Sequence, residues 1–291
     1  MEKRETVLLR NIFSEKTLRK LMEGEESSFY RDALESFIPG YETLSNAECF
    51  TKLYEYLSGE YRDEYYYRNT LLNSFLNNTK TSTALAEQWI GRSKADFILV
   101  GRNAVVYEIK TELDNFSRLE RQINDYYKAF TRVVVVTAES RSDELERRLD
   151  NPAVGITVLT SKGKLRTLRK PQDYVEKLSN RAMFRILRKK EYGNIIREYF
   201  GEVPEVSQFH YYRACLSLFE KIPTRQAERM LLRALKNRFS VDAEEYSRIP
   251  YALKSLVYFS SFRKRDYGKL ERLLTATAGR DLSGRKGSWS Y

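Results

Sequence analysis

Apolar residues recur every three or four positions over most of residues 1–78. The pattern runs through ETVLLRNIFSEKTLRKLMEG, SSFYRDALESF and NAECFTKLYEYLSGEYRDEYYYRNTLLNSFL. This spacing gathers the apolar side chains on one face of a helix, so it predicts a series of amphipathic helices. Pro39-Gly40 marks a break before the third stretch, and Ser45 or Asn46 is placed to cap the helix that follows.

The pattern changes at residues 82–110, where three short apolar runs are separated by GRS and GRN. Short runs between turn residues predict a three-stranded antiparallel meander. Residues 115–130 return to the helical period, and VVVVT at 133–137 is typical of a buried central strand. A polar helix over 140–150 and a strand hairpin over 155–168 follow. This order of elements predicts a mixed α/β sheet at about residues 60–170.

Helical periodicity returns after Pro171 and continues almost to the end of the chain, with breaks at Pro204, Pro223 and Pro250. We therefore expect an α/β protein in three consecutive regions. These are an N-terminal helical region at 1–58, a mixed-sheet core at 59–170 and a basic helical domain at 171–291.

The formal net charge of +11 is unevenly distributed along the 291 residues. Residues 1–161 carry 22 basic and 26 acidic side chains, whereas residues 162–291 carry 29 basic and 14 acidic ones. A basic half favours a polyanionic partner, because Lys and Arg contacts to phosphates supply most of the nonspecific affinity for nucleic acid. A well-solvated basic surface is the alternative that fits the same charge.

The scarcity of histidine and cysteine limits the possible chemistry. His210 is the single histidine, which excludes a His-rich metal site, and two cysteines cannot build a disulfide framework, so we expect a reducing cytoplasm. No run approaches about 18 apolar residues, and the apolar run near the N-terminus is too short and charged for a signal peptide. We therefore expect neither a membrane span nor a membrane partner.

Acidic side chains converge if the meander has tight turns. If the first GR is a two-residue turn, Glu87 lies opposite Asp96 on the neighbouring strand. If GRN is a three-residue turn, Asp96 lies opposite Glu108. Residues at i and i+2 share a face of a strand, so Lys110 joins Glu108. This register gathers four charged side chains, and a slip of one residue would scatter them.

Three carboxylates this close repel one another unless a cation neutralises them. Oxygen ligands suit Mg²⁺ or Mn²⁺, and such an ion binds a phosphoryl oxygen and lowers the pKa of a bound water. A neighbouring lysine can orient that water or neutralise charge that develops on phosphorus. The alternative is that these side chains form ordinary surface ion pairs, although Glu108 and Lys110 end an apolar strand and Asp96 begins one.

The array of Asp96 followed by Glu108-Ile109-Lys110 resembles the PD-(D/E)XK nuclease superfamily. The stretches SKADFILV, VVYEIKTELDNFSRLERQINDY and FTRVVVVT resemble a bacterial and phage subfamily of it, and Ala95 stands where the motif has proline. Gln122 and Tyr126 match the Gln-x-x-x-Tyr motif of the RecB-like branch, which implies a DNA substrate. The resemblance implies a restriction-endonuclease-like core of one helix, a three-strand meander, a helix and a strand.

The resemblance also implies individual roles. Asp96 and Glu108 would ligate Mg²⁺ or Mn²⁺ together with the Ile109 carbonyl, and Lys110 would be catalytic, with Gln122 and Tyr126 from the following helix. The register argument adds Glu87 as a further metal ligand.

Other polar residues near these motifs are weaker candidates. The superfamily often recruits an acidic residue from the preceding helix, and Glu64 or Glu60 stands in that place. We also expect contacts to nucleic acid from four residues near the meander, although solvated surface charges are the alternative for them: Arg92, Lys94, Thr111 and Arg118.

The expected function is therefore a metal-dependent nuclease that hydrolyses phosphodiester bonds, with DNA favoured over RNA as substrate. The alternative is a non-cleaving nucleic-acid-binding module on a nuclease fold, as part of a defence or repair complex. A homodimer or larger complex fits either function, because double-strand cutting by a single-site enzyme generally needs two subunits.

Overall fold

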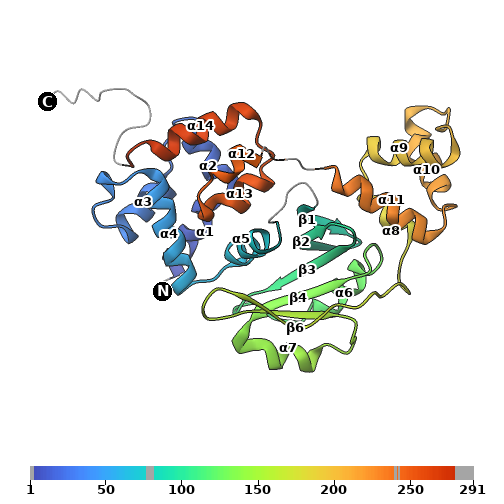
Figure 1. Ribbon diagram of the computed structural model, residues 1–291, viewed down its shortest axis with the longest axis horizontal. Coiled ribbons are helices and arrows are strands. Elements are labelled where there is room, and N and C mark those ends of the chain that lie inside the picture. Colours follow the sequence, from blue (N-terminus) through green and yellow to red (C-terminus); the bar gives the residue numbers. More distant parts are fainter. Residues whose placement is uncertain (1–2, 77–81, 239–240, 242, 279–291) are drawn as a thin grey trace. The chain divides into compact units, whose positions relative to one another are not determined.

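The structure is a computed structural model that describes residues 3–76, 82–238, 241 and 243–278. The chain divides into two compact units (Figure 1). Residues 74–240 form a sheet unit, and residues 1–73 together with 241–291 form a helical unit. Within the described ranges, no helix is long and apolar enough to cross a membrane.

A six-stranded mixed sheet forms the centre of the sheet unit (Figure 1). Its strands lie side by side in chain order and are β1 (Thr83–Ile90), β2 (Ser93–Val100), β3 (Ala104–Lys110), β4 (Val133–Ala138), β5 (Gly155–Leu159) and β6 (Leu165–Arg169). β3, β4 and β5 are parallel neighbours, and the other pairs are antiparallel. All six residues of β4 are buried, as the β-branched run predicts. The expectation of a mixed α/β sheet is confirmed.

The register of the meander matches the one expected from its turns. Ala86 pairs with Phe97 and Gln88 with Ala95, so Glu87 stands opposite Asp96. The β2–β3 ladder has the register that sets Asp96 opposite Glu108. The first turn has only two residues between Ile90 and Ser93, and the second closes with a hydrogen bond of 2.9 Å from the Gly101 amide to the Asn103 carbonyl.

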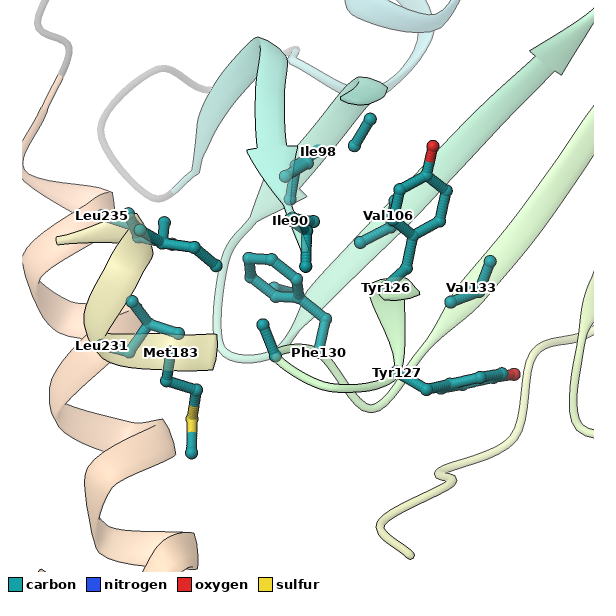
Figure 2. Packing of buried hydrophobic residues seen from close by; sticks show 14 of the residues in the cluster. Ile90, Ile98, Val106, Tyr126, Tyr127, Phe130, Val133, Met183, Leu231 and Leu235 are labelled. Atoms are coloured by element: carbon teal, nitrogen blue, oxygen red, sulfur yellow. The ribbon is translucent and has the colours of Figure 1, made fainter. Parts of the chain in front are cut away.

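Helices on the sheet unit complete its core. α6 (Leu119–Tyr126) follows β3, and the short η2 (Glu139–Arg141) and α7 (Ser142–Arg148) follow β4. The chain then forms α8 (Asn180–Ile186), α9 (Lys189–Phe200), α10 (Gln208–Phe219) and α11 (Thr224–Lys236). One buried cluster joins apolar side chains of the sheet, α6, α8 and α11 (Figure 2), including Ile90, Ile98, Phe130, Met183, Leu231 and Leu235.

An arginine just after α11 ties these helices to the sheet. The side chain of Arg238 is only 4% exposed and pairs with Glu191 of α9. It also donates to the Gln88 side chain of β1 at 3.0 Å and to the Ile186 carbonyl at 2.6 Å. These contacts, with the shared apolar cluster, place residues 171–240 in the same unit as the sheet. The unit boundaries at 73/74 and 240/241 thus differ from those at 58/59 and 170/171 that the sequence suggests.

The helical unit combines both ends of the chain. Its elements are α1 (Lys3–Ile12), α2 (Glu15–Met22), α3 (Ser28–Phe37), η1 (Tyr41–Thr43), α4 (Asn46–Glu60), α5 (Glu64–Phe75, which ends at the unit boundary), α12 (Ala243–Ser247), η3 (Tyr251–Leu253), α13 (Lys254–Phe259) and α14 (Lys264–Thr275). Ser45 caps α4 in a capping box, as expected. The buried Asn46 side chain donates to the Leu273 carbonyl at 3.0 Å, and Asn69 donates to the Tyr251 carbonyl at 3.0 Å. Buried amides thus join segments that are far apart in the sequence.

Candidate active site

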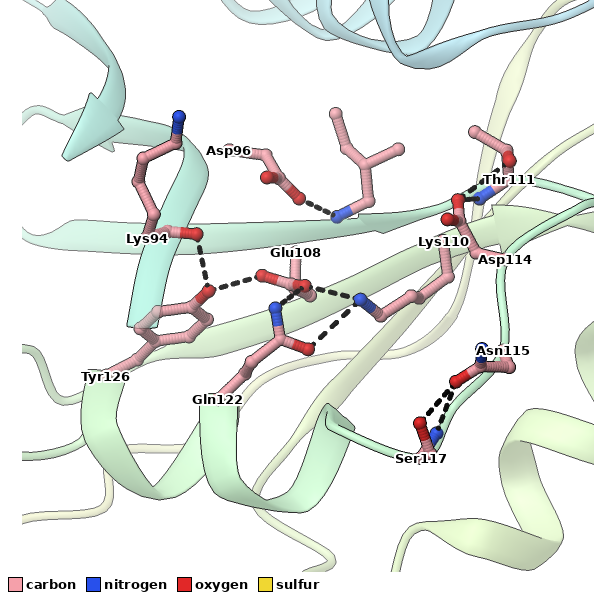
Figure 3. A network of polar contacts seen from close by, with 11 residues as sticks. Lys94, Asp96, Glu108, Lys110, Thr111, Asp114, Asn115, Ser117, Gln122 and Tyr126 are labelled. Carbon is pink, nitrogen blue, oxygen red and sulfur yellow. Dashed lines mark hydrogen bonds and ion pairs between the residues drawn. The ribbon is translucent and has the colours of Figure 1, made fainter. Parts of the chain in front are cut away.

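Glu108 is the centre of a buried polar network at the end of β3 (Figure 3). The residue is 1% exposed. Its Oε1 accepts hydrogen bonds from Lys110 Nζ, at 2.7 Å, and from the Gln122 side-chain amide. Its Oε2 accepts one from the Tyr126 hydroxyl. Gln122 and Tyr126 are one turn apart on α6, so both reach the same carboxylate.

Burial and hydrogen bonding act in opposite directions on Glu108. Burial raises the pKa of this carboxyl, while Lys110, Tyr126 and Gln122 lower it, and the net shift is upward. Burial also raises the pKa of Tyr126 far above its usual value, and the neighbouring Glu108 raises it further. The tyrosine is therefore a neutral hydrogen-bond donor to a carboxylate that has little contact with water.

Lys110 uses two of its three hydrogen-bond donors within the network. The residue is 8% exposed, and its Nζ lies 2.7 Å from Glu108 Oε1 and 3.0 Å from Gln122 Oε1. An ammonium group has three donors, so one remains for another group. An ionised carboxylate offers about four lone-pair sites, of which Glu108 uses three. In its ionised form Glu108 thus keeps one acceptor position, and Lys110 keeps one donor.

Asp96 lies where the β2–β3 ladder ends. The paired residues begin at Phe97 and Tyr107. Beyond this pair, the Asp96 side chain connects the two strands in place of a backbone hydrogen bond, because its Oδ2 accepts from the Ile109 amide at 2.7 Å. This bond fixes the carboxylate beside the Glu108-Ile109-Lys110 stretch (Figure 3). The Ile109 side chain is buried, and the role of its carbonyl as a metal ligand stays a prediction.

Glu87 and Asp96 are two acidic groups on adjacent strands of the sheet unit whose side chains lie near each other. Each offers a carboxylate oxygen within 4.8 Å of the other. Two oxygens that bind one Mg²⁺ lie about 3–4 Å apart, because each Mg–O bond is about 2.1 Å long, so a small side-chain movement suffices. Glu87 has a φ of 56°, an irregularity in β1 that interrupts the ladder opposite Asp96. The donor set fits a hard divalent cation such as Mg²⁺ or Mn²⁺.

The expected nucleic-acid contacts differ in their surroundings. Lys94 forms an ion pair with Glu87, and its carbonyl oxygen lies 2.9 Å from the Tyr126 hydroxyl oxygen. Thr111 is engaged by Asp114, whose Oδ2 accepts from both the amide and the hydroxyl of Thr111. The side chains of Arg92 and Arg118 are exposed.

The two glutamates suggested as helix carboxylates lie in the helical unit. Glu64 begins α5 and forms an ion pair with Arg68 one turn later, at 3.1 Å. Its place in a metal site stays a prediction, and the side chain of Glu60 lies outside the described part of the chain.

Asp125 has a structural role that sequence reasoning missed. Its Oδ2 accepts from the Arg92 amide at 3.1 Å and from the Ser93 hydroxyl at 2.8 Å, and its Oδ1 pairs with Lys128 at 2.6 Å. Burial alone would raise the pKa of Asp125, but the bonds from Lys128, Ser93 and Arg92 outweigh it and hold the pKa below its usual value. Asp125 thus fastens the β1–β2 turn to α6. Its position four residues after Arg121 and three before Lys128 predicts a local ion pair, but it does not reveal the contact with the turn.

Comparisons with known proteins give a family but no activity. The model of the family described as bacteriophage P4 protein cII matches residues 58–255, which is more than half of the chain. No curated protein matches the chain. Among solved structures, it is similar to a protein of unknown function from Silicibacter pomeroyi, SPO1766, with 15% identity and a TM-score of 0.28 over 37% of this chain and 67% of the other. The chain belongs to the bacteriophage P4 protein cII family.

Proposed function

We propose that this member of the bacteriophage P4 protein cII family is a nuclease that uses Mg²⁺ or Mn²⁺ to hydrolyse phosphodiester bonds, with DNA as its substrate. One observation carries the proposal: Glu108, Lys110, Gln122 and Tyr126 form one buried network beside the acidic pair Glu87–Asp96. Structural stability alone does not require such an arrangement, since a buried ion pair is often no more stable than apolar residues of the same size.

The resemblance of this array to the PD-(D/E)XK superfamily supports the same proposal. That resemblance gives Asp96 and Glu108 as ligands and Lys110 as a catalytic residue, and we propose a restriction-endonuclease-like core on this basis. The meander register agrees with it, because Asp96 stands opposite Glu108 on adjacent strands. The basic side chains of residues 162–291 favour a polyanionic substrate.

Each side chain then has a specific task. Asp96, Glu87 and the remaining lone-pair site of Glu108 would hold the metal ion, which supplies a water of lowered pKa and an electrophile for the phosphoryl oxygen. Lys110, through its remaining donor, binds the attacking water or the phosphate oxygen and neutralises charge there. Gln122 and Tyr126 hold the Glu108 carboxylate and the Lys110 ammonium in place.

A cleavage assay tests the proposal. Fluorescently labelled linear, nicked, branched and single-stranded DNA, and RNA, are incubated with the protein and Mg²⁺ or Mn²⁺, with EDTA as a control. We expect metal-dependent cleavage that Lys110→Ala reduces by about 100-fold or more, the scale of a lost electrostatic catalyst. Lys162→Ala, in the exposed β5–β6 turn, is the matched control and should cleave normally.

Two results would contradict parts of the proposal. Cleavage that persists in folded Lys110→Ala would show that the buried network does not take part in catalysis. Binding of nucleic acid without cleavage of any substrate in either metal would instead support the non-cleaving binding module.

A further inference from the structure

A basic cavity lies beside α6 and is lined by residues of this helix other than Gln122 and Tyr126, which reach Glu108. It is formed by the β1–β2 turn, α6 and the start of α8, all within the sheet unit, and its volume is about 510 Å³. Its charged lining residues are Arg92, Arg121, Asp125, Lys128, Arg181 and Arg185. From this cavity we infer a second contact site for nucleic acid, at which arginines hold a phosphate of the backbone away from the scissile bond. The inference rests on the proposed function for the identity of the polyanion.

The charge of the cavity is strongly positive even after internal pairing. Five cationic side chains line the cavity with one carboxylate, Asp125, which already accepts from the Arg92 backbone amide, the Ser93 hydroxyl and the Lys128 ammonium group. Arg181 pairs with Glu220 outside the cavity. Among the described residues, Arg92, Arg121 and Arg185 form no ion pair. Three guanidinium groups around one space therefore have no counter-charge among the residues that the structure describes.

Phosphate is the anion that suits this arrangement. A guanidinium group presents a planar fork of donors that matches two phosphate oxygens, and several guanidiniums around one cavity can share one phosphate. The three arginines come from three separate elements: Arg92 from the turn, Arg121 from α6 and Arg185 from α8. Their convergence is a property of the fold that no single helix surface supplies.

The position of the cavity relative to the acidic pair favours a nucleic-acid chain over a small free anion. Gly91, which lines the cavity, is four residues from Glu87 along the hairpin, and Arg92 is four residues from Asp96. Four strand residues span about 13 Å, at about 3.3 Å each. One strand of B-DNA rises 3.4 Å per nucleotide, so this is about four nucleotides. A backbone whose scissile phosphate lay at a metal ion on Asp96 would thus reach the cavity with a phosphate about four nucleotides away.

Asp125 fixes two walls of the cavity, the β1–β2 turn and α6, to each other. Its bonds to the Arg92 amide and the Ser93 hydroxyl join the turn to α6. Gly91 has a φ of 62°, and a Cβ built there would lie 2.7 Å from Asp125 Oδ1. The turn is therefore in close contact with the helix, which presents the Arg92 side chain beside Arg121.

Fluorescence anisotropy with a labelled DNA duplex in EDTA tests this inference without any cleavage. We expect Arg121→Ala and Arg185→Ala each to weaken binding about five- to tenfold at low salt, with a larger loss in the double variant. The slope of log Kd against log salt should fall by about one for each phosphate that an arginine no longer neutralises. Arg121→Lys should retain part of the affinity, because it keeps the charge and loses the fork.

Arg147→Ala is the matched control, since this exposed arginine lies on α7, in the connection from β4 to β5. It should bind as the unmodified protein does, and far-ultraviolet circular dichroism should show all variants folded. The inference is overturned if the folded double variant keeps its affinity and salt slope, or if Arg147→Ala weakens binding equally. Because no metal is present, these outcomes are independent of whether the protein cleaves DNA.

Discussion

Replacement of Asp125 by alanine should destabilise the sheet unit by about 3 kcal/mol. The residue is 5% exposed and accepts hydrogen bonds from the Arg92 amide and from Ser93, which is 4% exposed. A hydrogen bond to an ionised group contributes about 1.5 kcal/mol or more, and both donors would lose their acceptor. The bond from Lys128 adds less than about 1 kcal/mol, because that side chain is 46% exposed.

Urea unfolding measures this loss, and hydrogen exchange of the Arg92 amide locates it. In Asp125→Ala, the amide should exchange faster because its acceptor is gone. Asp125→Asn keeps an oxygen acceptor and loses the charge, so its loss should be smaller, at about 1 kcal/mol. The exposed Asp150 is the matched control, and Asp150→Ala should stay within about 0.5 kcal/mol of the unmodified protein.

The effect of Asp125 should also depend on pH. Its folded pKa is lower than its usual value of 3.8, because hydrogen bonds favour the ionised form. The stabilisation is therefore present above the unfolded pKa and is lost as the pH falls through the folded one. The difference between Asp125→Ala and the unmodified protein should shrink in acid. A loss below about 1 kcal/mol at neutral pH, with the Arg92 amide still protected, would refute this role of Asp125.

Three further substitutions should have measurable effects on unfolding in urea. Gly91→Ala should lower the unfolding free energy by about 2 kcal/mol, because alanine disfavours a positive φ and its Cβ would displace the Asp125 side chain. A variant of unchanged stability would contradict the close contact between the turn and Asp125. Tyr126→Phe removes a hydrogen-bond donor from the buried Glu108 carboxylate, so it should lower the unfolding free energy by about 2 kcal/mol and slow any cleavage. Unchanged stability would show that this hydrogen bond contributes nothing. Arg238→Ala leaves Glu191 of α9 without its ion-pair partner and should cost about 3 kcal/mol of unfolding free energy. A loss under about 1 kcal/mol would contradict the role of Arg238 in joining the helices to the sheet.

The sheet and its register could be predicted from sequence because local rules determine them. Side chains alternate along a strand, so a two-residue turn after Ile90 leaves one register that keeps the apolar residues of both strands buried. The same rule places Glu87 opposite Asp96 and Asp96 opposite Glu108. The β4 run was equally clear, since strands buried on both faces are apolar throughout.

The packing of the helices could not be predicted in this way. An amphipathic stripe shows that a helix buries one face, but it does not show which surface covers that face. The helices α11 and α14 both carry an apolar stripe, yet Leu231 of α11 is buried in the core of the sheet unit and Leu273 of α14 is buried in the helical unit. Asp125 was missed for a related reason, because its partners lie 32 and 33 residues away in the chain.

We propose that the carboxylates beside Lys110 form a metal-dependent site for phosphodiester hydrolysis. The most direct test follows cleavage of labelled DNA with Mn²⁺, comparing the unmodified protein with Asp96→Asn. We predict metal-dependent cleavage by the unmodified protein and its loss, by about 100-fold or more, in the folded variant. Equal cleavage by both proteins would contradict the claim.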